Sequence, residues 1–205
     1  DFMQASIQTK IYTFSLQYPD FLFPGTTQYS SDPAPKGLSI EVAMNSINPF
    51  NWIKVGLKIK KERPDLIIVR YWIPFLAPCL GTILSIAKSN KHTKVIAIVD
   101  NMIPHEKRIG DRLLTKYFVR AVDGFLTMSK KVQDDVRLFT HKPSCIAPHP
   151  IYDHFGEAIP TTEARNLLHL QDTDKVILFF GFVRAYKGLD LLIEAMSDPA
   201  IQAAG

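Results

Sequence analysis

The sequence predicts an α/β fold, in which a parallel sheet is covered by helices on both faces. Short apolar segments alternate along the chain with segments whose apolar residues recur at helical spacing. This alternation is typical of parallel sheets, because each connection between parallel strands needs a crossover, usually a helix. At 205 residues, 46% of them hydrophobic and 21% charged, the chain is long enough for one large globular domain and part of another.

Six short segments are predicted to be strands, because each is rich in β-branched or aromatic residues. They are residues 10–15, 66–71, 94–99, 124–128, 144–147 and 176–180. The apolar run 66–87 is nearly long enough to cross a membrane. However, Arg70 interrupts it and Pro74 and Pro78 would break a helix, so we interpret its start as a buried strand.

Three helices are predicted between these strands. Residues 49–61 place Phe50, Ile53 and Leu57 on one helical face. Asp111 can cap the second helix and Ser129 the third. The apolar stripes of these two helices would be Leu113, Leu114, Tyr117, Phe118 and Ala121, then Val132, Val136 and Phe139.

The first two helices also carry rows of basic side chains. These are Lys54, Lys58 and Lys61, then Arg112, Lys116 and Arg120. A solvated face is the default interpretation of such rows, and docking on anionic lipid is the alternative. The formal net charge of +4 fits phosphates, nucleic acid or an anionic membrane and does not select among them.

The predicted domain boundary follows a proline-rich break near residue 150. Residues 1–155 would form the first domain, and residues 156–205 a linker with a helix at 162–170 and only the opening of a second domain. A lone strand–helix unit cannot bury its own faces. Residues 18–37 are predicted to be a long loop, and loops of that length inside a compact domain are usually functional or mobile. Cys79 and Cys145 are isolated thiols, expected to be buried in a protein of a reducing compartment.

The stretch "VILFFGFVRAYKGLDLLIEAM" predicts an anion-binding corner. A strand ending at Gly181 allows a tight turn, and the helix that begins near Gly188 directs unpaired N–H groups at the loop. Arg184 offers a planar fork for phosphate oxygens and Lys187 a mobile point charge. The corner is therefore interpreted as a diphosphate grip, and two solvated surface cations are the alternative.

Other common chemistries lack their sequence signatures. There is no GxGxxG, GxxxxGK[ST] or GxSxG motif. The histidines and carboxylates around His105 and His149 do not match zinc spacings, so no metal and no other cofactor is expected. Basic residues do not interleave with exposed aromatic residues, so nucleic acid is not an expected partner.

The segment "FFGFVRAYKGLDLLIEAM" resembles the start of the C-terminal domain in bacterial family-4 glycosyltransferases of the GT-B fold. That family has a Gly-x-x-Arg-x-x-Lys-Gly loop between a strand and a helix. Upstream blocks are similar to its N-terminal domain in the same order. They are "YTFSLQYPDFLFPG", "INPFNWIKVGLKIKKERPDLIIVRYWIPFLAP", "VDNMIPHEKRIGDRLLTKYFVRAVDGFLTMS" and "APHPIYDHFG".

This resemblance implies a retaining glycosyltransferase of the hexosyltransferase type. It would move a sugar from a nucleotide-sugar donor to an acceptor hydroxyl, with two Rossmann-like domains across a cleft and without an essential metal. Donor diphosphate would be held by Gly181, Arg184, Lys187 and Gly188. The family's first strand would precede Asp1 and its later acidic donor motif is absent, so the chain as given is expected to be truncated at both ends and inactive.

The family's usual catalytic-site histidine is replaced here by Asp100. Either Asp100 or the nearby His105 would take that role, and Asn101 and Ser129 would line the acceptor cleft. The family's bacterial members suggest cell-surface polysaccharide or glycolipid synthesis on a saccharide or lipid-linked acceptor, in the cytoplasm or at the inner face of the membrane. The alternatives are a non-catalytic nucleotide- or phosphate-binding module and a basic membrane-surface interaction domain.

Overall fold

The computed structural model divides into two compact units, Asp1–His149 and Pro150–Gly205. The division falls slightly before the predicted boundary at residue 155. The structure describes residues 5–20, 27–29, 33–34, 37–104, 106, 108–149, 151–152 and 156–203.

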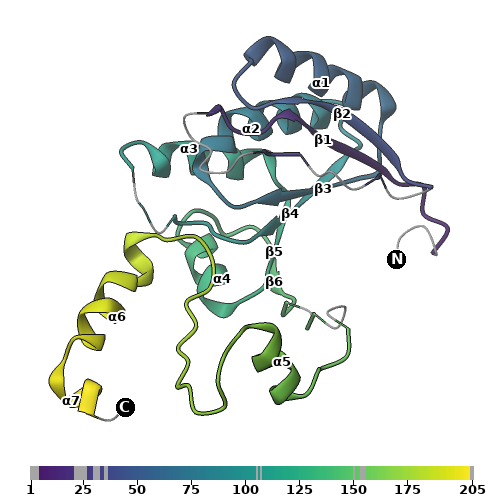
Figure 1. Ribbon diagram of the computed structural model, residues 1–205. Helices are drawn as coiled ribbons and strands as arrows, with labels where there is room; N and C mark the ends of the chain where they lie inside the picture. Colours follow the sequence, from purple (N-terminus) through teal and green to yellow (C-terminus); the bar gives the residue numbers. More distant parts are fainter. Residues whose placement is uncertain are drawn as a thin grey trace. The chain divides into compact units, whose positions relative to one another are not determined.

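The first unit is an α/β structure whose strands all pair in parallel, as the sequence predicts (Figure 1). One sheet holds two strands and the other four, in the order β3-β4-β5-β6. The strands are β1 Lys10–Leu16, β2 Ser39–Asn45, β3 Leu66–Tyr71, β4 Lys94–Val99, β5 Gly124–Thr127 and β6 Ser144–Ile146. Five of the predicted strands are therefore confirmed, and β2 is a strand that the sequence did not predict.

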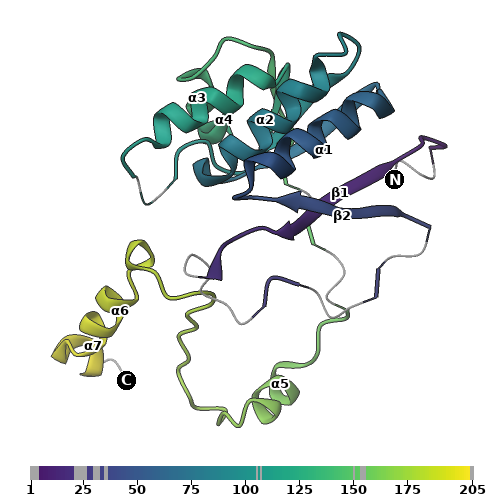
Figure 2. The same cartoon turned by 90° about the horizontal axis from the view of Figure 1, so that it is seen from above.

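Three helices of this unit form one layer, in which α2 lies between α1 and α3 (Figure 2). The helices of the unit are α1 Pro49–Glu62, α2 Ala77–Lys88, α3 Asp111–Ala121 and α4 Lys130–Arg137. Gly56 permits the close approach of α1 to α2, because a Cβ at this position would lie 2.9 Å from Cβ of Ile86. A Cβ on Gly81 would likewise lie 2.7 Å from the ring of Tyr117.

The core lies between this helical layer and one face of the four-stranded sheet. Val95, Ala97 and Val99 on β4 are fully buried, whereas Leu66 and Ile68, which point to the other face of β3, are 49% and 45% exposed. Covering of both faces is thus not seen in the described residues. Strands β3 to β6 follow one another in a single direction, so right-handed crossovers place the helices that connect them on the same side of this sheet.

Several other predictions are wrong. Pro74 and Pro78 do not break a helix: Pro74 opens a 3-10 turn, Pro74–Leu76, and Pro78 lies in the first turn of α2, where proline is tolerated. Asp111 is not the cap of α3, since Gly110 occupies that position and the Asp111 carboxylate accepts a hydrogen bond from the Arg108 N–H. Cys145 is exposed, whereas Cys79 is buried as predicted.

The faces of two helices also differ from expectation. On α1 the buried side chains include Val55 and Ile59, while Phe50, Ile53 and Leu57 are exposed. On α3 the predicted stripe is split, because Phe118 and Ala121 are buried and Leu113 and Tyr117 are exposed. Ser129 does cap α4, with its hydroxyl oxygen accepting from the Val132 N–H at 3.3 Å. No helix in the described residues has both the length and the apolarity needed to span a membrane.

The second unit contains helices and loops. Its elements are α5 Thr161–Leu167, the 3-10 turn Ala185–Lys187, α6 Leu189–Met196 and α7 Pro199–Ala203. The predicted strand 176–180 is wrong, because these residues have no ladder partner and Leu178 and Phe180 are 79% and 87% exposed. A strand needs a second strand for its backbone hydrogen bonds, and the described part of this unit offers none.

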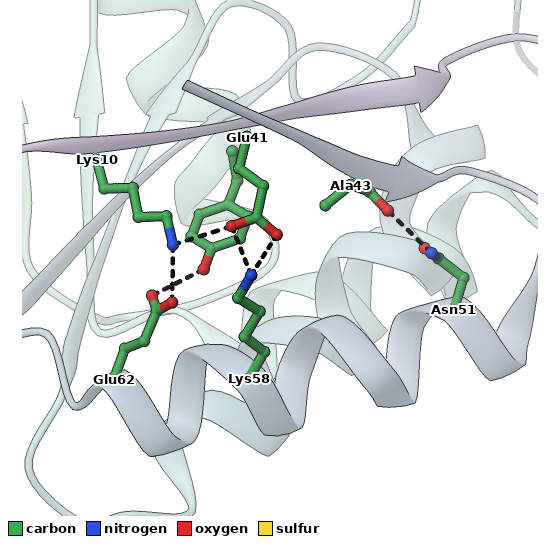
Figure 3. A network of polar contacts seen from close by, with 7 residues as sticks. Lys10, Glu41, Ala43, Asn51, Lys58 and Glu62 are labelled. Carbon is green, nitrogen blue, oxygen red and sulfur yellow. Dashed lines mark hydrogen bonds and ion pairs between the residues drawn. The ribbon is translucent and has the colours of Figure 1, made fainter. Parts of the chain in front are cut away.

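A network of charges fastens β1 and β2 to α1 (Figure 3). Lys10 Nζ lies 2.9 Å from Glu41 and 2.8 Å from Glu62, and Lys58 Nζ lies 2.5 Å from Glu41. Hydrogen bonds from Lys58 and then Lys10 lower the pKa of Glu41. Burial opposes the charged form of Glu62, but bonds from Lys10 and Tyr12 outweigh it and lower this pKa as well.

We expect acid to weaken the first unit through these carboxylates. Their pKa values are lower in the folded state than the usual 4.5, so their stabilising effect is present above that pH and is lost as the pH falls through the folded values. Urea midpoints measured from pH 7 to pH 3 should decline below about pH 4.5. A Glu41→Gln, Glu62→Gln variant should be less stable at pH 7 and should converge with the parent near pH 3. A constant difference at all pH values would contradict this assignment.

Candidate functional site

The first candidate site lies at the carboxyl ends of β4 and β5. Val99 pairs with Thr127, so Asp100 and Asn101 follow β4 at the edge where Ser129 follows β5. The structure thus places these three predicted residues at one edge of the sheet, which is where parallel sheets carry ligands. His105, the fourth residue predicted for this site, lies outside the described residues.

Asp100 is held by an arginine that sequence reasoning missed. Its carboxylate accepts from Arg70 Nε at 2.7 Å and from Arg70 Nη2 at 3.2 Å, a two-point contact. Arg70 pairs with Ile98 across the β3–β4 ladder, so Asp100 is its diagonal neighbour on the same face. The Asp100 side chain is 19% exposed and that of Arg70 is 63% exposed, so the guanidinium can also meet an anionic ligand.

A cluster of aromatic side chains lies beside the carboxyl ends of β1 and β3. Trp72 Nε1 donates to the Tyr18 hydroxyl at 2.6 Å, and the Tyr18 ring stacks on Phe75 with centroids 6.1 Å apart. The Gln28 side chain bonds both the N–H and the carbonyl of Tyr18, at 2.7 and 2.6 Å. The start of the predicted functional loop is therefore fixed in place. The available sequence signal was a Trp directly after one strand and a Tyr two residues after another.

A small pocket opens on the two-stranded sheet near this loop. Its lining is a mixture of amide, hydroxyl and apolar groups, from Thr13, Phe14, Gln17, Gln28, Tyr29 and Val42. Neutral hydrogen-bonding groups beside an aromatic ring suit an uncharged polar ligand better than an ionised one. Ser129, in contrast, is engaged as the cap of α4, which accounts for its presence without a ligand.

The second candidate site is the glycine-bounded corner of the second unit. Gly181 has φ +104°, in the region that favours glycine, and a Cβ there would lie 2.8 Å from Lys187 Nζ. The ammonium of Lys187 therefore lies against the Gly181 backbone, 6.0 Å from the centroid of the Phe179 ring. Gly188, with φ +65°, accepts the Leu192 N–H and begins α6.

Two cations of this corner are available to an anion. In the part of the chain that the structure describes, neither Arg184 nor Lys187 forms an ion pair with a carboxylate. Both precede the first turn of α6, whose N–H groups and positive dipole end add to the field at the loop. The predicted grip residues therefore share one exposed corner, although the expected strand before it is absent.

No group of three or more His, Cys, Asp or Glu residues able to hold a metal ion occurs among the described residues. The fold and the two sites define an α/β protein with parallel sheets, a polar strand-end cluster and a separate cationic corner. Comparison of the chain with protein-family models, with curated proteins and with solved structures gave no match.

Proposed function

We propose that the protein is a retaining glycosyltransferase of the GT-B type, which moves a sugar from a nucleotide-sugar donor to an acceptor hydroxyl. The observation that carries the proposal is the corner at residues 181–188, where Lys187 lies against Gly181 and Arg184 forms no ion pair with a carboxylate of the described residues. A sugar nucleotide presents a diphosphate, and planar and point-like cations beside a helix N-terminus are suited to it.

The chemical role of this corner would be to stabilise the leaving group. Negative charge builds on the diphosphate as the sugar–phosphate bond breaks. Preorganised cations lower the barrier when they interact more strongly with this charge in the transition state than with the bound substrate. No pair of catalytic carboxylates is then required. Gly188 would begin the helix whose N–H groups face the same charge.

The acceptor side would be the strand-end cluster of the first unit. Asn101 can bond hydroxyls, the Arg70–Asp100 pair presents polar groups of both signs, and the pocket near Tyr29 offers neutral polar groups. His105 or Asp100 would assist the acceptor hydroxyl. Replacing both in separate variants distinguishes them, since the residue that touches the acceptor should lower kcat when changed to alanine.

The test is release of free nucleotide from a panel of nucleotide sugars, using the protein purified at its natural length. We expect release from one donor class and a drop of about ten- to a hundredfold in Arg184→Ala, because one charge-assisted contact contributes about 1.5–3 kcal/mol. Lys131→Ala, which removes an exposed lysine of α4, is the control and should leave the rate unchanged.

A non-catalytic nucleotide- or phosphate-binding module is the second candidate, favoured by the same two cations, Arg184 and Lys187, before the first turn of α6. It predicts saturable binding of a nucleoside diphosphate, weakened in Arg184→Ala, without release of nucleotide from any sugar donor. Binding that ignores Arg184→Ala, together with no release, would remove both candidates.

A further inference from the structure

The outward faces of α1 and α3 carry apolar side chains where a water-facing helix normally carries polar ones. On α1, Phe50 is 84% exposed, Ile53 46% and Leu57 53%, at helical spacings of three, four and seven. They lie opposite the buried Val55 and Ile59, so they form the centre of the outer face. Scattered apolar residues need no explanation, but an aligned stripe that includes an almost fully exposed phenylalanine indicates a contact surface.

The outer face of α3 repeats this arrangement. Leu113 is 73% exposed and Ile109, just before the helix, is fully exposed. The helix between them, α2, presents Ser85 and Ser89, whose hydroxyls donate to the carbonyls of Gly81 and Ile86 at 2.6 and 2.7 Å. These serines are satisfied within the helix and can leave water with little loss.

Unpaired basic side chains flank the apolar ones. In the described residues none of them forms an ion pair, unlike Lys58, which is held by Glu41. They are Lys54, Lys61, Arg112, Lys116 and Arg120. The two carboxylates of these helices are engaged elsewhere, Glu62 with Lys10 and Asp111 with a backbone N–H. We call these basic residues together with Phe50, Ile53, Leu57, Ile109 and Leu113 the α1–α3 surface.

We propose that the α1–α3 surface docks on a membrane that contains anionic lipid. Exposed apolar side chains surrounded by lysine and arginine match the boundary between charged headgroups and acyl chains, where each basic residue is attracted and each apolar one leaves water. Nucleic acid fits less well, because a phosphate backbone offers no partner for Leu57 or Ile53. The charge complementarity selects an anionic surface, and the proposal does not depend on the proposed enzymatic function.

The test is sedimentation of the chain with vesicles of phosphatidylcholine alone or of phosphatidylcholine mixed with phosphatidylglycerol. We expect binding only to the anionic vesicles and a decrease with added salt. A Lys54→Gln, Lys61→Gln variant should bind about 30-fold more weakly, because each of the two lysines loses its attraction to the anionic headgroups. A Phe50→Ser, Leu57→Ser variant should bind at least about tenfold more weakly, because two apolar side chains no longer enter the boundary between headgroups and acyl chains.

Matched controls separate this surface from general charge and apolarity. Lys94→Gln with Lys131→Gln removes the same charge from positions that form no ion pair in the described residues of the unit, and Leu138→Ser removes a side chain that is 64% exposed at the C-cap of α4. Both controls should bind like the parent. A Phe50→Trp variant adds a positive signal, since its additional emission should shift to shorter wavelength with anionic vesicles.

Three results would overturn the proposal. One is equal sedimentation with neutral and anionic vesicles, and another is a loss of binding in the controls as large as in the surface variants. The third is a concentration-dependent dimer that Phe50→Ser abolishes in the absence of any vesicle binding, which would assign the surface to a second copy of the chain. Circular dichroism of each variant checks that its fold is retained.

Discussion

Replacing Phe118 with alanine should lower the free energy of unfolding of the first unit by about 3–5 kcal/mol. Phe118 has no exposed surface and stacks on Tyr71, with ring centroids 4.1 Å apart and planes 12° apart. Tyr71 is also fully buried, and its hydroxyl bonds Thr115 Oγ1 at 3.2 Å, so neither ring can move far to fill the space. The cost therefore includes both lost transfer energy and an unfilled cavity.

The measurement is denaturant unfolding of the chain followed by near-ultraviolet circular dichroism. The matched control is Leu113→Ala on the same helix, which removes a side chain that is 73% exposed and should change stability by less than about 0.5 kcal/mol. If Phe118→Ala abolishes folding, Phe118→Leu provides the second point, with a smaller loss expected. Equal effects of Phe118→Ala and Leu113→Ala would contradict the placement of the core.

Local sequence patterns predicted the four-stranded parallel sheet because several of its strands are short runs of mainly apolar residues. The bounds of β3 and β4 agree with prediction, since each is a mainly apolar run of six residues, and β4 ends where the polar Asp100 follows. Strand β2, with the sequence SIEVAMN, was missed because Glu41 interrupts the apolar pattern. Its carboxylate is compensated by Lys10 and Lys58, which are distant in sequence, and no local signal reveals such partners.

Helix α2 was missed for a related reason. Prolines were counted as helix breakers, but a proline in the first turn lacks only an N–H that would have no partner in any case. The outward position of Phe50 could not be found from periodicity either. A helical period tells which residues share a face, and only packing against α2 decides which face is buried.

Some features of the two candidate sites could likewise be predicted from the sequence, and others could not. Topology places Asp100, Asn101 and Ser129 at one edge of the sheet, and the sequence therefore located that edge from the ends of predicted strands. The contact of Arg70 with Asp100 depends on the register between β3 and β4, which single-strand patterns do not contain. For the cationic corner, the order of glycine, arginine and lysine was enough, because all its groups lie within eight residues. The strand predicted before it was wrong, because the described residues of this unit contain no second strand that could pair with residues 176–180.

Under the proposed glycosyltransferase function, replacing Arg184 and Lys187 together with alanine should reduce sugar transfer by about a hundred- to ten-thousandfold in the protein purified at its natural length. Each cation would contribute about 1.5–3 kcal/mol to the charged diphosphate, and both would act most strongly as the leaving group gains charge. The loss should appear in kcat, with KM little changed, because the interaction is made in the transition state and not with the bound substrate. Lys94→Ala with Lys131→Ala removes equal charge from the first unit and should have no such effect.

Two further variants distinguish a specific grip from general attraction of an anion. Arg184→Lys keeps the charge but loses the planar fork, so it should restore only part of the lost rate. Gly181→Val places a branched residue at φ +104° and a Cβ where the Lys187 ammonium lies, so it should impair transfer although every charge is retained. Full activity in both variants would mean that the corner contributes only its net charge, and the diphosphate-binding role assigned to its geometry would then be wrong.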